Sequence, residues 1–455
     1  MNEEKTIIST KQYLAVASVL AAMMMGVLNG TIMNVALPTL AKEFAVESST
    51  AIWVVNAFQL VITMLMLSFA TLGDIYGYRK IFFTGVSVFI GASILCACST
   101  SFEMLVASRI LQGFGSACTM SVNIALIRLI YPPKILGRGM AINAMVISVS
   151  AASGPTLAGL ILSFASWNWL FLINLPLGLI ALFVGWKLLP EKQPCETKRS
   201  FDKISALGNA LTFGLLIYTL EGVAHAENQT LILFQLILLI LIGTLYVRRQ
   251  QKLTTPILPV DLFKISIFSL SIASSTASFT AQMLAMVSLP FFFQNVLGFD
   301  AVEIGLLMTP WPLATILAAP LSSRLLERHV HPGLLGGIGM GIFAIGLSML
   351  YLLPQHPEKW QIIWRMALCG MGYGLFQTPN NVTITTSVPM SRTGGASGML
   401  GTARQLGQTL GATSVALVFR FFSEDKEFHM CILFAVIFAL VSMTLSVLRM
   451  PHRKI

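Results

Sequence analysis

The sequence predicts an all-α membrane protein of fourteen transmembrane helices, in which two pseudo-symmetric six-helix bundles flank an inserted helix pair. The composition and the lengths of the apolar runs carry this prediction. Of 455 residues, 55% are apolar and 11% are charged, whereas a soluble domain is about 25% charged. A soluble fold has too little interior for that much apolar side chain, which excludes a soluble enzyme, a nucleic-acid-binding protein and a disordered scaffold.

Fourteen apolar runs are long enough to cross the hydrocarbon of a bilayer, which takes about 20 residues in a helix. None of the 19 acidic residues lies deep within a run. The runs cover residues 14–36, 51–73, 81–99, 104–127, 138–165, 167–189, 204–223, 230–248, 266–293, 302–326, 333–353, 360–385, 394–421 and 429–449.

The first six runs form the predicted N-terminal bundle, residues 14–189. The run at 14–36 exceeds the roughly 7–15 apolar residues of a signal peptide, so we expect it to be a retained first span. The fourth run begins with Arg109, which Gly113 and Gly115 follow. The twelfth run has an arginine followed by a similar glycine cluster, which indicates a duplicated architecture.

The remaining runs supply an inserted pair and a second bundle. The pair, 204–223 and 230–248, lies within residues 190–265 and is flanked by the most basic loops of the chain. The last six runs form the predicted C-terminal bundle, residues 266–449. Carriers built from two related bundles bind their substrate between the bundles near the midplane, so the sequence predicts one shared central site.

The distribution of Lys and Arg predicts the orientation, because basic residues are enriched in cytoplasmic loops. With the N-terminus inside, 22 of the 29 basic residues are cytoplasmic and four lie in outer loops. We therefore expect a multi-pass protein of the inner (cytoplasmic) membrane with both termini in the cytoplasm. The same bias explains the net charge of +10. The three remaining basic residues, which lie within runs, are Arg109, Arg365 and Arg404.

The loop after the second run carries Gly73, Asp74, Gly77, Arg79 and Lys80. Glycines four residues apart let a short connection turn tightly against a neighbouring helix. The carboxylate can cap a helix N-terminus or pair with a base, while the two basic residues stay on the cytoplasmic side. Taken alone, such a loop is a simple anchor between two spans.

The fifth run contains Gly154, Pro155 and Gly159. The proline removes one backbone hydrogen bond, and the small residues around it permit close helix contact. The segment therefore predicts a helix that lies unusually near its neighbours.

Taken together, these segments resemble the major facilitator superfamily and, within it, the fourteen-span drug:proton antiporter family of multidrug exporters, over about residues 14–449. The loop at 73–80 is similar to the superfamily's gating loop. Arg109, with Gln112 and the two glycines after it, looks like the span-four motif to which a role in proton transfer is attributed. The segment 154–159 resembles the antiporter signature of exporters. The resemblance implies alternating access powered by the proton gradient, with no cofactor.

The sequence departs from the family pattern at four positions. Ile75 and Tyr78 stand where the gating loop usually has arginines, and Ala158 replaces a usual glycine. Asn29 stands where such exporters commonly carry an aspartate. Proton coupling within a membrane normally uses a carboxylate, and this one is missing.

Proton coupling in this chain therefore has to use other groups. Asn29 cannot titrate, and arginines within the runs stay protonated in proteins. Arg109 and Arg404 are the candidate coupling residues, with water near Arg109 as a proton carrier. Acids at the rims of the runs are the alternative, namely Asp74, Glu221 and Glu303.

Polar residues within the runs are the candidates for the substrate pathway. A lipophilic cation favours a buried acid that offsets its desolvation, and no run supplies one at depth. Amides are plentiful instead, although each could also hold two helices together. Trp311 lies inside a run, away from the interface where tryptophan usually sits. The candidates are Asn29, Asn34, Gln59, Gln112, Asn143, Gln282, Trp311 and Gln377.

Two functions fit these observations. The first is export of hydrophobic or amphiphilic small molecules (multidrug efflux) by alternating access and proton antiport. The alternative is a carrier of neutral or anionic metabolites that is not driven through a deep membrane carboxylate. The expected partners are a small-molecule substrate and the lipid bilayer, with no nucleic acid, and a periplasmic partner is left open.

No enzymatic activity and no metal site are predicted. A lipid-linked transferase would need paired carboxylates that hold a metal or act as a base, and the chain has no such pair at a suitable surface. Cys96 and Cys98 lack the further Cys or His ligands that a zinc site needs.

Overall fold

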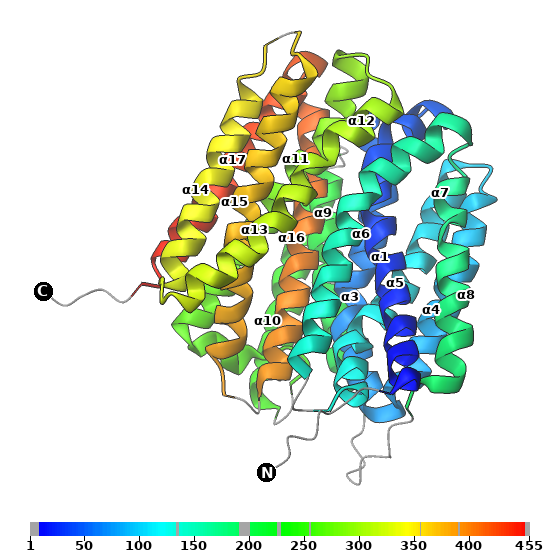
Figure 1. Ribbon diagram of the computed structural model, residues 1–455, viewed down its shortest axis with the longest axis vertical. Coiled ribbons are helices and arrows are strands. Elements are labelled where there is room, and N and C mark those ends of the chain that lie inside the picture. The colour runs from blue at the N-terminus through cyan, green and yellow to red at the C-terminus, as the bar shows by residue number, and fades with distance from the viewer. Residues whose placement is uncertain are drawn as a thin grey trace, which may run out of the picture.

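The computed structural model describes residues 9–132, 136–190, 201–224, 229–253, 256–354, 356–389 and 392–450. This part of the chain folds into helices joined by short connections and contains no strand (Figure 1). The first group of helices comprises α1 (Thr10–Glu43), α2 (Ser48–Ala51), α3 (Trp53–Tyr76), α4 (Tyr78–Ala97), α5 (Phe102–Ile130), α6 (Leu136–Phe164), α7 (Trp169–Leu172) and α8 (Asn174–Leu188).

Two long helices follow, α9 (Lys203–Ala224) and α10 (Gln229–Lys252), and then a second group. The second group comprises η2 (Val260–Lys264), α11 (Ser266–Phe291), η3 (Phe292–Val296), α12 (Ala301–Met308), α13 (Pro310–Glu327), α14 (Pro332–Tyr351), α15 (Lys359–Thr386), α16 (Thr393–Phe421) and α17 (Glu424–Val447). Two predicted runs are therefore divided: 167–189 into α7 and α8, and 302–326 into α12 and α13, where Pro310 follows the break.

Twelve helical segments of the described chain are long and apolar enough to cross a membrane. The all-α membrane fold is thus confirmed, whereas the count of fourteen spans stays a prediction. The two predicted runs outside the twelve are α15 and α16, of 28 and 29 residues. At 1.5 Å per residue both are long enough to span the bilayer, but amides and arginines such as Gln377 and Arg404 lower their hydropathy.

The helices pack mainly within each group. In the first group α1 lies against α6 and α8, and α5 lies against α3 and α4; in the second, α11 lies against α16 and α17, and α15 against α13 and α14. The main contacts between the groups are those of α6 with α12 and α13, of α2 and α3 with α16, and of α1 with α11 and α12. The groups therefore face each other across a limited set of helices.

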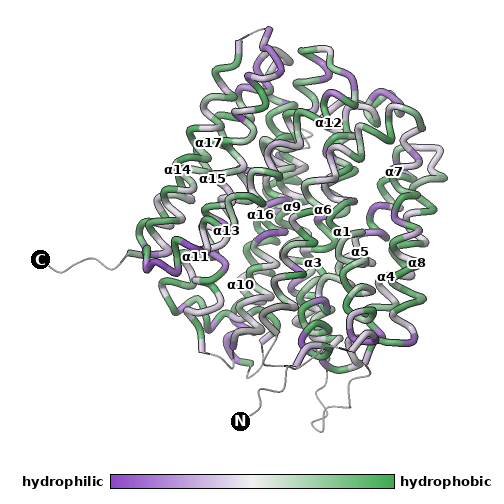
Figure 2. Tube along the Cα trace, viewed as in Figure 1, coloured by the Kyte–Doolittle hydropathy of each residue, from purple (hydrophilic) through white to green (hydrophobic). Residues whose placement is uncertain are grey.

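Hydrophilic residues gather at the two ends of the helices, and apolar residues fill the length between them (Figure 2). We call the end where α1 begins the basic end, and the opposite end the acidic end. The basic end carries Lys11, Arg79, Lys80, Arg128, Lys187, Lys203, Arg248, Arg249, Lys252, Lys264, Arg324, Arg328, Arg392 and Arg449. The acidic end carries Glu43, Glu47, Glu103, Asp300, Glu303, Glu358 and Glu427.

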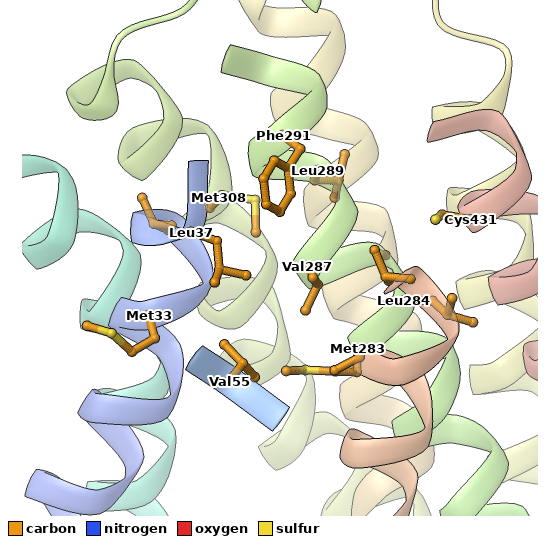
Figure 3. Packing of buried hydrophobic residues seen from close by; sticks show 14 of the residues in the cluster. Met33, Leu37, Val55, Met283, Leu284, Val287, Leu289, Phe291, Met308 and Cys431 are labelled. Carbon is orange, nitrogen blue, oxygen red and sulfur yellow. The ribbon is translucent and has the colours of Figure 1, made fainter. Parts of the chain in front are cut away.

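Apolar packing differs between the two ends. At the acidic end one buried cluster includes side chains from both groups of helices. Figure 3 shows part of this cluster, with Leu37 of α1 and Phe291 of α11 on either side of Met308. Towards the basic end the first group has its own cluster, which contains Phe82 and Leu126, and the second group has another, which contains Phe268. The acidic end is therefore the one that continuous apolar packing closes.

Polar contacts fix the helices at the basic end. Arg449, just beyond α17, donates hydrogen bonds to Asn380 Oδ1 of α15 at 2.6 Å and to Ser271 Oγ of α11 at 3.0 Å. Burial lowers the pKa of Arg449 to about 10, which leaves it charged at neutral pH. Arg449 therefore ties α17 to two helices of its own group.

The inserted pair α9 and α10 is also closed by an ion pair at the basic end. Arg249 donates to both carboxylate oxygens of Asp202 at 3.0 Å. Burial alone would raise the pKa of Asp202, but hydrogen bonds from Ser205 and Arg249 outweigh it and hold this pKa below its ordinary value. Asn209 of α9 donates to Met64 O of α3 at 2.7 Å, which attaches the pair to the first group.

Close helix contact in the second group depends on Gly370 of α15. A Cβ atom there would lie 2.0 Å from the backbone oxygen of Trp311 in α13. We expect Gly370→Ala to lower the free energy of unfolding by about 1–3 kcal/mol, because a backbone atom cannot move aside cheaply. Gly91→Ala in α4 is the control, since nothing lies within 4 Å of its added Cβ. Thermal melting of the detergent-solubilised variants measures both, and equal melting temperatures would contradict the close α13–α15 contact.

Candidate functional site

A cavity of about 210 Å³ lies between the two groups of helices. One wall comes from α1, α3, α5 and α6, and the other from α11, α12, α13, α15 and α16. Its apolar lining is rich in flexible methionines and aromatic rings, which adapt to ligands of varied shape. These apolar side chains include Phe58, Met120, Phe279, Met283, Met286, Met308 and Trp311.

The polar lining of the cavity consists mainly of amides. Five of the eight predicted pathway residues are among the lining residues: Asn34, Gln59, Gln282, Trp311 and Gln377. Gln408, another of the amides within the runs, also lines the cavity, as do Tyr373 and Gln405, which were not predicted. Gln408 follows Arg404 by four residues on α16 and so lies on the same face of the helix, a spacing that could have found it.

Arg404 is the one charged residue in this lining, and no acidic residue contributes to it. Within the described chain, Arg404 forms neither an ion pair nor a hydrogen bond with another residue. The cavity wall therefore carries one positive charge that no described carboxylate balances.

Arg109 lies outside the cavity, fully buried among α1, α3 and α5. Its Nε donates to Val54 O at 2.7 Å, and its Nη1 donates to Gln112 Oε1 at 2.5 Å and to Asn29 Oδ1. The guanidinium also stacks over the Phe58 ring, with 4.2 Å between its carbon and the ring centroid. The network therefore ties three helices of the first group through one cation.

No carboxylate of the described chain joins this network. Gln112 extends it to α4, where its Nε2 donates to Ser93 Oγ at 2.8 Å. Arg109 Nη2 and Asn29 Nδ2 are buried and find no partner among the described residues. A buried charge normally requires pairing, and here neutral amide and carbonyl oxygens together with an aromatic face supply the compensation.

Three predicted pathway residues thus lie away from the cavity lining. Asn29 and Gln112 accept hydrogen bonds from Arg109, and Asn143 of α6 accepts one from Asn123 of α5 at 3.0 Å. Each of these amides connects helices, which is the alternative role that amides within spans commonly have.

The loop between α3 and α4 makes its turn at Gly77, whose φ of +97° only glycine adopts readily. The Tyr78 hydroxyl donates to the Asp74 carboxylate, and Arg79 donates to Trp186 O of α8 at 2.5 Å. At Gly73 a Cβ would come within 3 Å of Tyr78 and of α5. The loop therefore connects the ends of four helices of the first group, and Lys80 remains exposed.

The glycines of α6 allow contacts with both groups of helices. A Cβ at Gly154 would lie 2.0 Å from Thr31 Oγ1 of α1, and one at Gly159 would lie 2.6 Å from the backbone oxygen of Ala301 in α12. Pro155, between them, lines the cavity. The hydroxyls of Thr156 in α6 and Thr309, at the start of α13, are 2.5 Å apart. This segment therefore contacts the second group beside the cavity.

The remaining candidates for coupling lie at the rims. Glu303 pairs with Lys359 at 2.6 Å at the acidic end. Arg365, which is a basic residue within a run but no coupling candidate, donates to Gln361 O of its own helix at 2.7 Å. Asp74 is bonded to Tyr78, as described above, and the side chain of Glu221 lies outside the described residues. Asp74, Glu303 and Arg365, whose side chains the structure describes, are not among the residues that line the cavity.

A multi-pass helical fold with a cavity between its two groups of helices is the arrangement that membrane carriers use. Residues 14–412 match the sequence profile of the Major Facilitator Superfamily, and the chain belongs to this superfamily. The family that the motifs of the sequence indicated is thereby confirmed.

Three relatives share most of this chain's length. It is 53% identical to the uncharacterized transporter YebQ of Escherichia coli, over 97% of this chain and 96% of the relative. It is 30% identical to the riboflavin transporter RibZ of Clostridioides difficile (89% and 87%) and 31% identical to the multidrug resistance protein Stp of Mycobacterium tuberculosis (84% and 71%).

A solved structure has the same fold. It is a POT family transporter in complex with a thioalcohol-conjugated peptide, with a TM-score of 0.73 over 96% of both chains and 14% sequence identity. The chain is thus a transporter of this superfamily.

Proposed function

We propose that this protein exports hydrophobic or amphiphilic small molecules by alternating access. The observation that carries the proposal is the central cavity between the two groups of helices, whose lining combines amides with methionines and aromatic rings. Such a lining holds an apolar body through contact area and orients polar groups through a few hydrogen bonds. The name of the relative Stp supports a drug-like substrate.

The moving parts of this mechanism are the two bundles, residues 14–189 and 266–449, each with six spans and separated by the inserted pair within 190–265. All fourteen runs cross the membrane, with the basic end in the cytoplasm, as the bias of basic residues requires. The continuous apolar cluster at the acidic end supports a state closed towards the outside. Substrate then enters from the cytoplasm and leaves when this cluster separates.

Proton antiport is the drive that the family resemblance implies, with Arg109 and Arg404 as the coupling residues. The hydrogen bonds of Arg109 join three helices next to the cavity. Phe58 connects this network with the cavity, because its ring lines the cavity and stacks on Arg109. A substrate that displaces the Phe58 ring would therefore also disturb the packing around the Arg109 guanidinium. Water admitted to that network would carry the proton.

A second function is favoured by the charge of the cavity. The lining contains Arg404 and no acid, which suits a neutral or anionic metabolite better than a lipophilic cation. The relative RibZ, named as a riboflavin transporter, supports a metabolite as cargo. The two functions differ in cargo and in driving force but use the same cavity.

Filling the cavity tests the proposal. Gly30 of α1 lines it, and nothing lies within 4 Å of an added Cβ, so Gly30→Leu places a side chain in the cavity without strain. We expect transport to fall by about 5- to 150-fold, since overpacking of an occupied site costs about 1–3 kcal/mol, with an unchanged melting temperature. The assay is accumulation of N-phenyl-1-naphthylamine, ethidium and 1-anilinonaphthalene-8-sulfonate in inverted membrane vesicles.

Gly91→Leu is the matched control, since this glycine of α4 is exposed, also has open space and lies outside the cavity. The proposal is supported if the wild-type protein transports at least one of the dyes and Gly91→Leu transports the same dye equally well. Full transport by Gly30→Leu would show that the cavity is not the pathway, and the absence of protein-dependent movement of all three dyes would overturn export of amphiphiles.

A further inference from the structure

The central cavity has polar groups whose hydrogen-bonding direction is fixed, and these are all donors. Arg404 and Trp311 donate hydrogen bonds and cannot accept them. Trp311 is 1% exposed, and its Nε1 has no partner among the described residues. Arg404, as shown above, has none either. Both come from the second group of helices, on α16 and α13.

The other polar lining groups do not oppose this pattern. Amides such as Gln59 and Gln282 present a donor and an acceptor and can rotate to suit either. A carboxylate would be the fixed acceptor that a cationic substrate needs, and the lining contains none. The wall of the second group therefore offers a positive charge to an incoming ligand, with the unpaired indole N–H of Trp311 buried behind the cavity surface.

An unbalanced arginine in a cavity within the membrane is costly unless water or a ligand compensates it. The planar guanidinium matches carboxylate and sulfonate geometry and forms paired hydrogen bonds with them. Next to it lie Phe279 and Tyr373, with 5.9 Å between their ring centroids, and Met283. A ligand that fits both the arginine and these apolar side chains has an acidic group and an apolar body. The cavity volume of about 210 Å³ limits that body to one or two rings.

We propose that the substrate of this cavity is an organic anion, an aromatic carboxylate or sulfonate whose acidic group pairs with Arg404 and whose ring packs on the methionine and phenylalanine wall. This inference rests on the proposed function and names the substrate class. It also accounts for the missing deep carboxylate, because a membrane potential that is negative inside itself drives an anion outward. Export of such a substrate needs no titrating acid within a span.

Binding of matched ligands to the purified protein tests this assignment. Naphthalene-2-carboxylate and naphthalene-2-carboxamide have nearly the same shape and differ in charge, and (2-naphthylmethyl)trimethylammonium supplies the opposite charge. Radiolabelled ligand is measured by scintillation proximity on wild type and on Arg404→Gln, Arg404→Lys and Arg365→Gln. Arg365 is a matched control because it also lies on a long helix of the second group but outside the lining.

We expect the carboxylate to bind wild type more tightly than the other two ligands. Arg404→Gln should lose about 10- to 100-fold in affinity for the carboxylate, the usual effect of removing a hydrogen bond to a charged group. Arg404→Lys keeps the charge but loses the paired hydrogen bonds, so it should bind the carboxylate more tightly than Arg404→Gln and less tightly than wild type. Arg365→Gln should equal wild type. Affinity for the carboxamide should change little in any variant.

The other outcomes distinguish a failure of the anion assignment from a failure of the proposed export function. Equal binding of the carboxamide or the ammonium ligand by wild type, or an unchanged carboxylate affinity in Arg404→Gln, would overturn the anion assignment and leave export of amphiphiles standing. If none of the three ligands binds wild type, both the anion assignment and the proposed use of this cavity fail.

Discussion

A disulfide between α6 and the start of α13 is expected to stop transport completely, and reduction is expected to restore it. Thr156 and Thr309 have their hydroxyl oxygens 2.5 Å apart, so a cysteine at each position can reach disulfide geometry. The pair joins the two groups beside the cavity, where Gly159 already brings α6 against α12. If the bundles must separate there to release substrate, a covalent bond holds the carrier in one state.

The measurement is dye accumulation by Thr156→Cys/Thr309→Cys in a background without the native cysteines, before and after oxidation and then after reduction. The matched control joins two helices within one group. Ser274 of α11 and Ser442 of α17 have hydroxyls 2.9 Å apart, and their cysteine pair should cross-link without loss of transport. Transport that survives complete cross-linking of 156 to 309 would refute separation of the bundles at this contact.

Loss of the Arg109 side chain is expected to have the second large effect. In Arg109→Leu, the buried oxygens of Val54, Asn29 and Gln112 lose the hydrogen bonds that Arg109 donates, and Gln112 Oε1 keeps only the weak contact with the Cys96 thiol at 3.9 Å. Each unsatisfied buried group costs about 1–3 kcal/mol, so the variant should lose several kcal/mol of stability together with transport. Thermal melting in detergent measures the first effect and dye accumulation the second.

Two companion variants separate charge from packing at this position. Asn29→Asp gives Arg109 a carboxylate at the atom it already contacts and is expected to raise the melting temperature. Arg365→Leu is the control, because Arg365 is bonded to its own helix and should change stability by about 1 kcal/mol or less. A melting temperature of Arg109→Leu equal to that of Arg365→Leu would show that the buried network does not hold the helices together.

The amides of α1 show what sequence reasoning could achieve for the site. A polar residue within an apolar run is conspicuous, so both Asn29 and Asn34 are natural candidates for the pathway. They are five residues apart, which at 3.6 residues per turn places them about 140° apart around the helix. Asn34 faces the cavity and Asn29 faces Arg109. The composition of a run identifies its unusual residues, but only packing shows what each side of the helix meets.

The same limit explains the residues that the sequence analysis missed or placed elsewhere. Gln405 and Tyr373 line the cavity although nothing in their own segments distinguishes them from other polar residues of spans. Gln112 lies three residues after Arg109 and therefore on the same side of α5, where it joins that network. The position of Gln112, three residues after an arginine, therefore predicts its hydrogen-bond partner. Its polarity alone does not show that it lines the substrate pathway.

The sequence by itself determined that this chain is a multi-pass helical membrane carrier, because hydropathy, the distribution of basic residues and the spacing of the motifs are properties read along one chain. The tertiary structure decided which polar groups meet. Arg109 reaches Asn29 across 80 positions of sequence, and Thr156 reaches Thr309 across 153. Such pairs depend on the rotation of each helix about its axis and on which helix lies beside it, so their chemistry arises only when the helices are packed.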